Sequence, residues 1–305
     1  MTSALGNHRT ADCIPLWTAV SLFIRAASKR HTSALPHLRQ RVMVAIADSH
    51  HVRVATYNVH KCRGLDGRVR PERIVGVLRE LNADIIALQE VLSLSGNQCG
   101  DDHAQFIAGE LGFRHCFGEN RKHAGRMYGN ALLSRFPWTR ACNYDISISG
   151  HEPRGCLRAN ITLPGGPQLH LFNVHLGTSF RERRLQARRL ISPEILNRPD
   201  LRGVRIVLGD FNEWTTGTTT RMLRAHFASP DLRTNRTRSY PGLFPILHLD
   251  HIYFDSALSL RHLTVHKSLR ALVASDHLPF VMDLSLAAEI SDPNHSEGSA
   301  VFNLS

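Results

Sequence analysis

The feature that most constrains the fold is a set of short apolar runs that each have polar side chains directly at one end. In the stretch RIVLGDFNEW, residues 205–214, an aliphatic run stops at Gly209, and Asp210 and Asn212 follow. Such a run is typical of a strand buried in a sheet. Asp and Asn are also ordinary turn residues, so this stretch alone favours a simple turn. The same arrangement recurs along the chain, and turn chemistry does not explain the repetition.

The recurring polar side chains are carboxylates, amides and imidazoles. They lie in ATYNVH, IIALQE, LFNVH, VLGDFN, LDHIYF and SDHLPF, and include Asn58, His60, Gln89, Glu90, Asn173, His175, Asp210, Asn212, Asp250, Asp276 and His277. Polar groups at the edge of an apolar sheet cost desolvation energy unless they are paired or bind a metal. The set therefore predicts one shared site. Oxygen ligands with one or two carboxylates, and no cysteine, favour a hard ion such as Mg²⁺.

Strands and helices interleave along the chain, which predicts an α/β fold. The predicted strands are 52–59, 83–91, 130–136, 157–163, 169–176, 205–211, 249–255 and 280–286. The predicted helices are 71–82, 104–111, 180–196 and 218–227. Eight or more strands imply two packed sheets, and the helices are expected to cover their outer faces. The expected catalytic domain spans residues 50–287.

The two ends of the chain differ from this domain. Residues 1–49 are expected to be a partly disordered extension, and residues 288–305 a flexible tail, because the tail is polar and lacks periodicity. The run CIPLWTAVSLFI, residues 13–24, is too short for a membrane span and has no small-residue cleavage site after it. It is either an amphipathic surface helix or part of an upstream extension, since Met43 stands just before the first convincing strand.

Charge and cysteine usage limit the partners and the compartment. The formal charge is +11, and only Lys29, Lys61, Lys122 and Lys267 are lysines. The excess is therefore arginine, which suits phosphate or carboxylate, although the arginines are scattered and are equally compatible with solvated faces. The six cysteines contain no Cys-x-x-Cys pair and do not suggest a disulfide scaffold. A reducing cytoplasm is expected, and no transmembrane segment is predicted.

Seven motifs in register carry a family resemblance. They are TYNVH, ALQEV, YGNALLSRFP, FNVHL, LGDFNE, LDHIY and SDHLPF, and they span roughly residues 52–286. In this order the chain resembles the endonuclease/exonuclease/phosphatase superfamily, the DNase I-like fold. The resemblance implies a four-layer α/β/β/α sandwich and hydrolysis of a phosphoester with Mg²⁺ or Mn²⁺. It does not select the substrate, because one fold serves many functions.

The resemblance also implies roles for individual residues. Glu90 is expected to hold the metal, with Asn58 nearby and Asp276 contributing to the same shell. Asp210 is expected to orient and deprotonate the attacking water, and Asn212 to hold that water or the phosphate. His277 and Asp250 resemble the family's His–Asp pair, in which the carboxylate fixes the imidazole tautomer. These four strand ends and the segment before the last strand would then meet at one edge of the sheets.

Three further residues bear on substrate binding. His175 matches the second family histidine and is expected to lie across the phosphate. Arg154 is expected either to contact the phosphate or to form a surface ion pair with Glu152. Asn130 is assigned to substrate binding. It is also a departure, because DNase-type nucleases are expected to pair the histidine at the position of His175 with a glutamate. This departure makes strict DNase-like duplex cleavage doubtful and favours the sphingomyelinase-like and bacterial branches.

Three classes of function remain open from the sequence. The first is a metal-dependent phosphodiesterase or phosphatase that acts on an anionic phosphoester, with nucleic acid slightly favoured on charge. The second is a phospholipid or sphingolipid phosphodiesterase, or an inositol-phosphate phosphatase, with peripheral membrane contact through residues 13–24 in the lipid case. The third, a non-catalytic binding module, is least favoured because every position needed for chemistry is filled.

Overall fold

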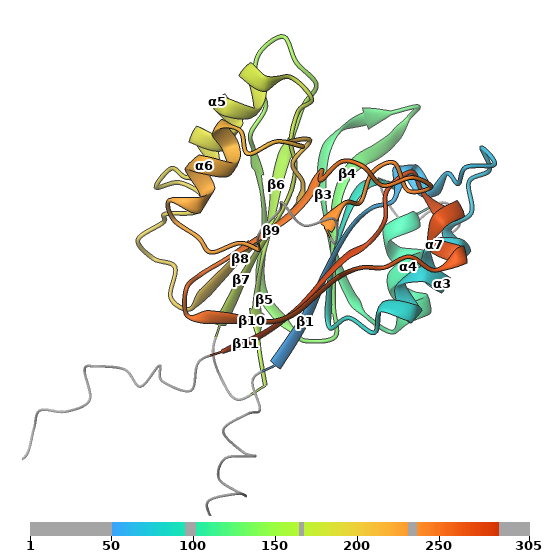
Figure 1. The fold of residues 1–305 in the computed structure, drawn as a ribbon, viewed down its shortest axis with the longest axis horizontal. Coiled ribbons are helices and arrows are strands. Elements are labelled where there is room, and N and C mark those ends of the chain that lie inside the picture. The colour runs from blue at the N-terminus through green and yellow to red at the C-terminus, as the bar shows by residue number, and fades with distance from the viewer. Residues whose placement is uncertain (1–50, 95–101, 165–167, 231–236, 287–305) are drawn as a thin grey trace, which may run out of the picture. The chain divides into compact units, whose positions relative to one another are not determined.

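Two β-sheets form the centre of the computed structural model, which describes residues 51–94, 102–164, 168–230 and 237–286 (Figure 1). The larger sheet has six strands in the order β10-β11-β1-β2-β4-β3. Its strands are β10 Leu258–Val265, β11 Phe280–Leu286, β1 His51–Asn58, β2 Ile85–Ser93, β4 Arg126–Ser134 and β3 Arg114–His123. The other sheet has five strands in chain order: β5 Trp138–Asp145, β6 Gly155–Thr162, β7 Gln168–His175, β8 Val204–Asp210 and β9 Asp250–Phe254.

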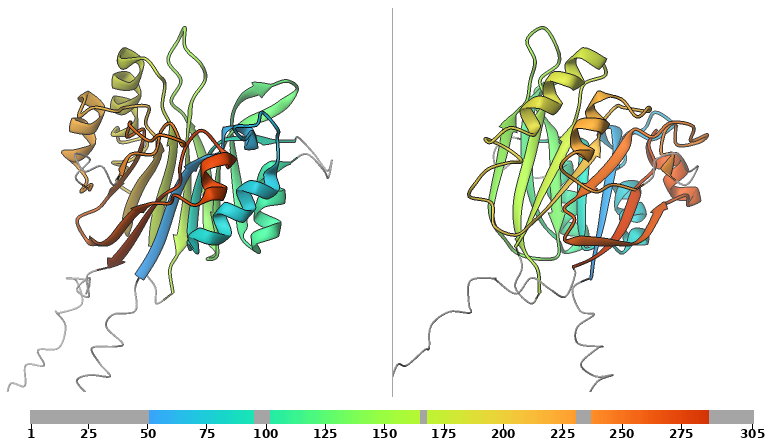
Figure 2. Two further views of the ribbon diagram at one scale, coloured as in Figure 1. Left: turned by 45° about the vertical axis from the view of Figure 1, so that its right-hand side comes forward. Right: turned by 60° about the vertical axis from the view of Figure 1, so that its left-hand side comes forward.

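Helices cover the outer face of each sheet. Helices α3, α4 and α7 lie beside the six-stranded sheet, and α5 and α6 lie beside the five-stranded sheet (Figures 1 and 2). Their bounds are α3 Pro71–Leu81, α4 His103–Leu111, α5 Phe180–Leu190, α6 Thr218–Arg224 and α7 Leu269–Ala274. A 3₁₀ turn, η1 His60–Cys62, follows β1. The predicted four-layer α/β/β/α arrangement and α/β class are therefore confirmed.

The helices begin and end where the local sequence dictates. Pro71 opens α3, where its missing N–H costs nothing, and Asn82 ends it in the left-handed conformation at φ 47°. The Asp102 side chain caps α4 by accepting a hydrogen bond from the N–H of Gln105, and Gly112 follows the helix at φ 68°. These signals explain why the predicted helices at 71–82 and 104–111 agree closely with the structure.

Two apolar cores hold the layers together. The larger fills the space between the sheets and extends under α3, and its fully buried members include Ile86, Leu88, Leu171 and Ile206. The second lies around Phe172, Val174, Val207, Tyr253, Leu190 and Leu223, on the side of the five-stranded sheet that faces α5 and α6. The central strands are buried on both faces, so they read as continuous apolar runs in the sequence.

Three elements have boundaries that differ from those predicted from the sequence. Helix α5 ends at Leu190 and not at residue 196, because Pro193 lacks the N–H that a helix requires. Helix α6 ends at Arg224 and not at 227, and the N–H of Ala228 pairs with Phe254 instead. Strand β4 begins earlier than predicted and stops at Ser134, whose hydroxyl accepts a hydrogen bond from the N–H of Phe136. The predicted extension 1–49, with residues 13–24, and the tail 288–305 lie outside the described residues.

Candidate active site

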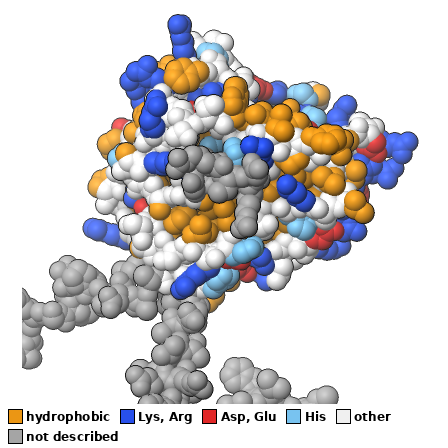
Figure 3. Space-filling view, in the orientation of Figure 1, with side chains coloured by type: hydrophobic (Ala, Val, Ile, Leu, Met, Phe, Trp, Pro, Cys, Tyr) orange, Lys and Arg blue, Asp and Glu red, His pale blue; other side chains and the backbone are white. Residues whose placement is uncertain are grey.

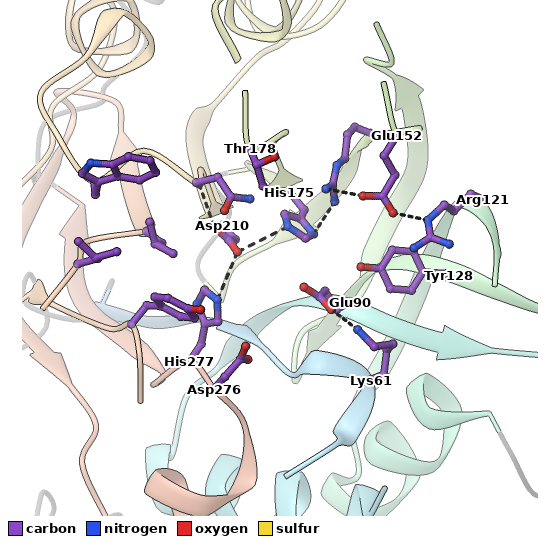
Figure 4. A pocket seen from close by; sticks show the side chains of 16 residues that line it. Lys61, Glu90, Arg121, Tyr128, Glu152, His175, Thr178, Asp210, Asp276 and His277 are labelled. Carbon is purple, nitrogen blue, oxygen red and sulfur yellow. Dashed lines mark hydrogen bonds and ion pairs between the residues drawn. The ribbon is translucent and has the colours of Figure 1, made fainter. Parts of the chain in front are cut away.

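The carboxyl ends of two parallel strand pairs meet at one edge of the sandwich. Strands β1 and β2 are parallel, with Asn58 beside Gln89, and β7 and β8 are parallel, with His175 beside Asp210. A pocket opens at this edge and is shown in Figure 4. It is lined by Lys61, Glu90, Arg121, Tyr128, Glu152, Arg154, His175, Thr178, Asp210, Asn212, Trp214, Tyr240, Leu247, Leu249, Asp276 and His277. Both sheets therefore contribute to one site.

Glu90 reaches the pocket because strand β2 is irregular at that residue. The register with β4 shifts between Leu88 and Val91, and Glu90 takes the left-handed conformation at φ 56°. A β-bulge of this kind breaks the alternation of side chains and redirects one of them. Gln89 is fully buried between the sheets and donates to Asn173, whereas Glu90 lines the pocket. Such a backbone conformation costs on the order of 1–3 kcal/mol and is concentrated at functional sites.

The Glu90 carboxylate has a cation and an amide as partners. Its Oε2 is 2.7 Å from Lys61 Nζ, and its Oε1 accepts a hydrogen bond of 3.0 Å from Asn58 Nδ2. Burial acts to raise the pKa of this carboxyl, but His175, Lys61 and Asn58 outweigh burial and lower the pKa to about 2. Glu90 is therefore ionised at every ordinary pH, and the Lys61 ammonium is already paired with it.

The donor set fits a hard divalent cation. Mg²⁺ binds through one or two carboxylates, keeps several waters and completes its shell with substrate phosphate. Glu90 supplies a carboxylate of this kind, and Asn58 lies beside it with its amide nitrogen, a hydrogen-bond donor, toward Glu90 Oε1. Asp276 lines the same pocket, but its Oδ1 is 3.5 Å from the His60 imidazole. Within the described residues no group of three or more His, Cys, Asp and Glu side chains is arranged to hold a metal.

The predicted His–Asp pair is present opposite Glu90. His277 Nδ1 is 2.9 Å from Asp250 Oδ2, which also accepts a hydrogen bond from the Ser239 hydroxyl. The Tyr240 ring packs against the imidazole with centroids 4.9 Å apart. Burial acts to lower the pKa of His277, but the negative charges of Asp250 and Asp210 prevail and raise it to about 10. The structure thus holds His277 as an imidazolium at neutral pH.

Asp210 lies between two imidazoles. Its Oδ2 is 3.6 Å from Nε2 of His277 and 3.6 Å from Nε2 of His175 (Figure 4). The same oxygen accepts a hydrogen bond of 3.0 Å from Asn58, and Oδ1 accepts one from the N–H of Asn212. Asn212 itself stands at φ 50°, and its amide donates to the carbonyl of Leu176. Asp210 is therefore a fixed carboxylate that can orient a water molecule and accept its proton.

His175 faces a guanidinium on its other nitrogen. Arg154 NH1 is 3.0 Å from His175 Nδ1, and Arg154 NH2 is 2.7 Å from Glu152 Oε2. The ion pair with Glu152 considered from the sequence is thus present, and it leaves Arg154 within the pocket lining as well. Burial and the charge of Arg154 lower the pKa of His175 to about 4. The imidazole is consequently neutral at neutral pH.

Asn130 does not occupy the place predicted for it. Its side chain is fully buried, lies outside the pocket lining and donates to the carbonyls of Gly155 and Asn173. These bonds tie β4 to the five-stranded sheet, so the amide serves the packing of the sheets. We therefore correct the substrate-binding assignment of Asn130. The partner of His175 that the sequence left unidentified is Arg154 and not an amide from YGNALLS.

Several pocket residues were missed from the sequence. The most prominent are Lys61, Arg121, Tyr128, Trp214 and Tyr240. Lys61 directly follows the motif TYNVH and Trp214 directly follows LGDFNE, so extending each motif by one residue could have found them. Tyr128 is already the first residue of the motif YGNALLSRFP. Arg121 and Tyr240 come from segments without apolar periodicity. Arg121 lies over the Tyr128 ring, 4.3 Å from its centroid.

Comparison with known proteins shows which family the chain matches. Residues 55–277 match the sequence model of the Endonuclease/Exonuclease/phosphatase family. Uncharacterized protein YbhP of Escherichia coli strain K12 is 32% identical over 244 residues, which cover 72% of this chain and 94% of that protein.

Solved structures share the fold. An endonuclease/exonuclease/phosphatase from Beutenbergia cavernae has a TM-score of 0.61 at 24% identity, covering 78% of this chain and 72% of its own. The Bacteroides thetaiotaomicron mannosyl-6-phosphatase Bt3783 has a TM-score of 0.62 at 18% identity, covering 77% and 100%. The human Nocturnin catalytic domain has a TM-score of 0.60 at 21% identity, covering 78% and 94%.

Proposed function

Because the chain belongs to the endonuclease/exonuclease/phosphatase family, we propose that it hydrolyses a phosphodiester with the help of Mg²⁺ or Mn²⁺. The observation that carries the proposal is the position of Asp210. A buried carboxylate stands between two imidazoles on one side of the pocket, and the ionised Glu90 stands on the other (Figure 4). This arrangement suits an attack by water on a phosphorus atom held between the two sides.

The residues of the pocket divide the reaction among them. Asp210 orients a water molecule, assisted by Asn212, and accepts its proton as the new P–O bond forms. The His277 imidazolium donates a hydrogen bond to the phosphoryl oxygens, where charge develops, and Asp250 keeps that imidazole oriented. A divalent ion bound at Glu90, with Asn58 and Asp276 nearby, would polarise the phosphoryl group and stabilise the leaving oxygen.

The charge of the molecule alone does not select the substrate. On the face shown in Figure 3, Lys and Arg side chains are spread around the surface and do not form a single stripe. A continuous basic stripe is the usual footprint of a nucleic-acid-binding surface. The positive side chains inside the pocket, Lys61, Arg121 and Arg154, are each paired with a carboxylate. They suit a single phosphodiester at the pocket as well as a polymer.

A substrate panel tests the proposal. Purified protein with and without Mg²⁺ would be given a synthetic aryl phosphodiester, plasmid DNA, single-stranded DNA and RNA, sphingomyelin vesicles and inositol phosphates. We expect metal-dependent release of product from at least one phosphodiester, and none from the Asp210→Asn variant. Equal rates for the two proteins, or no hydrolysis of any member, would contradict the proposal.

A second candidate is a phospholipid phosphodiesterase, and one observation favours it. The pocket lining includes the aromatic and aliphatic side chains of Trp214, Tyr240, Leu247 and Leu249. The segment 240–247, whose two end residues line the pocket, exposes Leu243, Phe244 and Ile246, with Phe244 74% exposed. The segment is held in place, because Gly242 N–H donates to the carbonyl of Asp276 at 2.6 Å and Tyr240 pairs with Leu247. A fixed apolar edge beside a phosphate site suits an amphipathic ester.

One double variant separates the two candidates. Phe244→Ser with Ile246→Ser removes apolar surface without touching Asp210 or either histidine. If the substrate is a lipid, activity on phospholipid vesicles falls while activity on the soluble aryl phosphodiester stays near that of the wild type. Unchanged rates on both substrates would dismiss the lipid candidate. Among the described residues no helix is both long and apolar enough to span a membrane.

We also propose residues 50–287 as the catalytic domain. Every residue given a role lies between Asn58 and His277, and β1 and β11, near the two ends of that range, are paired antiparallel in the six-stranded sheet. Limited proteolysis followed by mass measurement tests the boundary. A resistant core that is markedly longer or shorter than this range would move it.

A further inference from the structure

The two imidazoles beside Asp210 have opposite partners. His277 presents Nδ1 to a carboxylate, that of Asp250, at 2.9 Å. His175 presents Nδ1 to a guanidinium, that of Arg154, at 3.0 Å. Both rings direct Nε2 toward the same oxygen of Asp210, at 3.6 Å (Figure 4). The two histidines are thus matched in position and opposed in electrostatics.

The partner of a histidine nitrogen decides where the ring carries its proton. A guanidinium has only N–H donors and stays protonated in proteins, so it cannot accept a hydrogen bond. Nδ1 of His175 must therefore be the acceptor, with its lone pair toward Arg154. A ring whose Nδ1 accepts is neutral and carries its single proton on Nε2.

We infer that Arg154 is a positioning residue that fixes His175 as the neutral tautomer with its proton on Nε2. His175 then acts as a permanent hydrogen-bond donor toward the centre of the pocket and does not carry a proton between reacting groups. His277, whose Nδ1 donates to Asp250, is left as the one imidazole of the pair able to carry a positive charge. The role in binding phosphate rests on the proposed function, whereas the tautomer does not.

The surroundings of Arg154 hold its guanidinium in place. Its side chain is 6% exposed, and Glu152 takes the second terminal nitrogen. Glu152 in turn pairs with Arg121 at 2.6 Å, and Arg121 lies over the Tyr128 ring. The Arg154 backbone is pinned as well, because its N–H donates to the Ser147 hydroxyl. A guanidinium fixed at this many points can impose an orientation on the ring beside it.

The charges around His175 come from both sheets. Arg154 and His277 oppose a positive charge on the ring, whereas Asp210 and Glu90 favour one. Burial adds to the opposing side, and the balance lowers the pKa of His175 to about 4. This direction agrees with the hydrogen-bond argument, which stands on the contact alone.

Nitrogen NMR of the imidazole rings tests the inference directly. Protein labelled with ¹⁵N at histidine would be studied near neutral pH without substrate and with chelator, and the His175 signals would be assigned by their loss in His175→Asn. We expect Nδ1 of His175 to resonate as an unprotonated nitrogen and Nε2 as a protonated one. In Arg154→Met, Nδ1 is expected to become partly protonated, because nothing obliges it to accept. A protonated Nδ1 in the wild type would overturn the inference.

Two further variants separate positioning from structural support. Arg154→Lys keeps a donor for Nδ1, so the wild-type pattern of the ring should return. Arg158→Met removes a nearby buried arginine on strand β6, which begins directly after Arg154, and Arg158 lies outside the pocket lining. It should leave the His175 signals unchanged. If Arg158→Met and Arg154→Met altered the ring equally, the effect would be a general loss of packing and the inference would fail.

Kinetics supply the second readout. With whichever phosphodiester the protein hydrolyses, Arg154→Met should lower kcat on the order of 10²-fold with little change in KM, the usual result of losing one aligned donor. Arg154→Lys should recover at least tenfold of that loss. A kcat for Arg154→Met equal to that of the wild type would overturn the role of His175 as an aligned donor. Failure of the protein to hydrolyse any phosphodiester would count against the proposed function and would leave the NMR result standing.

Discussion

The two sheets bring different chemistry to the pocket. The six-stranded sheet supplies Glu90 and Asn58, and its adjoining turn supplies Lys61, so this side holds an ionised carboxylate matched to a cation. The five-stranded sheet supplies Asp210 and His175, so this side handles protons and hydrogen bonds. A carboxylate is central to both sides, but its neighbours give it a different task in each. The difference shows that environment, more than residue type, assigns the roles.

Asn58 joins the two sides. Its amide nitrogen donates to Glu90 Oε1 and to Asp210 Oδ2, both at 3.0 Å. Its carbonyl oxygen accepts a hydrogen bond from the N–H of His60 at 3.0 Å. One buried amide therefore links the cation side to the proton side and sets the spacing between their carboxylates.

The largest effect is expected from Asp210→Asn, which removes the carboxylate of the proton side. The amide keeps the size of the side chain but cannot accept a proton from water. We expect turnover to fall on the order of 10³-fold with the fold intact, since general-base catalysis contributes at least 10²-fold. Turnover would be measured on the responsive phosphodiester, and Mg²⁺ affinity by calorimetry. Normal turnover in this variant would contradict the role of Asp210 as the general base. Lost Mg²⁺ affinity with normal turnover would contradict the assignment of ion binding to Glu90 and proton transfer to Asp210.

Removal of the other carboxylate should give the opposite pattern. In Glu90→Gln the amide is a far weaker ligand for Mg²⁺, so we expect affinity for the ion to fall on the order of 10²-fold. Turnover should fall at low Mg²⁺ and recover in part when Mg²⁺ is raised, which Asp210→Asn should not do. The control is the melting temperature in chelator, expected to be close to that of the wild type. Unchanged Mg²⁺ affinity would move the ion away from Glu90.

The sequence predicted the centres of the sheets and missed their edges. The eight predicted strands are mostly central, and their apolar runs follow from burial on both faces. The missed strands β3, β5 and β10 all lie at edges of the two sheets. Edge strands leave one backbone edge unpaired and carry charged side chains that discourage pairing with other chains, as RHCFGENRKH in β3 does. Without an apolar pattern, such a strand cannot be told from a loop.

The site was predictable in part for a similar reason. Asp210, His175 and Asn58 end strands that the apolar pattern identifies, and Glu90 follows the apolar run of β2, so the pattern also locates them. The interactions that assign their roles are long-range. Arg154 and His175 are 21 positions apart in the chain, and the periodicity of apolar residues does not predict a contact between them. The bulge that redirects the Glu90 side chain is a feature of the backbone, and no residue type in the sequence marks its position.

The pH dependence of stability should distinguish the two histidines. The folded pKa of His175, about 4, lies below its ordinary value, so the unfolded chain binds more protons between about pH 4 and 6.5. Stability is therefore lost as the pH falls through that window, by up to about 1.4 kcal/mol per pH unit. For His277 the folded pKa is raised to about 10, so its contribution is full below about pH 6.5 and is lost as the pH rises to 10.

Urea unfolding in chelator measures both effects. Between pH 6.5 and 4.5 the unfolding free energy of the wild type should fall more steeply than that of His175→Asn, which lacks the titrating ring. Between pH 7 and 9.5 the wild type should fall more steeply than His277→Asn. Parallel curves for the wild type and either variant would show that the corresponding ring has an ordinary pKa.

The smallest effect is expected at Lys61, where the cation side already contains a cation. Its ammonium pairs with Glu90 at 2.7 Å, and a divalent ion at that carboxylate would have to displace or repel it. Residues His60, Lys61 and Cys62 stand at φ 44°, 59° and 57°, so the backbone is strained through the whole turn that presents this ammonium. We expect Lys61→Met to bind Mg²⁺ about three- to tenfold more tightly, because one nearby positive charge is lost in a partly exposed site. Calorimetry with the wild type and Arg63→Met, a neighbouring change outside the lining of this pocket, gives the comparison. Weaker binding in Lys61→Met would mean that the ammonium orients Glu90 for the ion and does not compete with it, and the cation side would then depend on Lys61 as the proton side depends on Arg154.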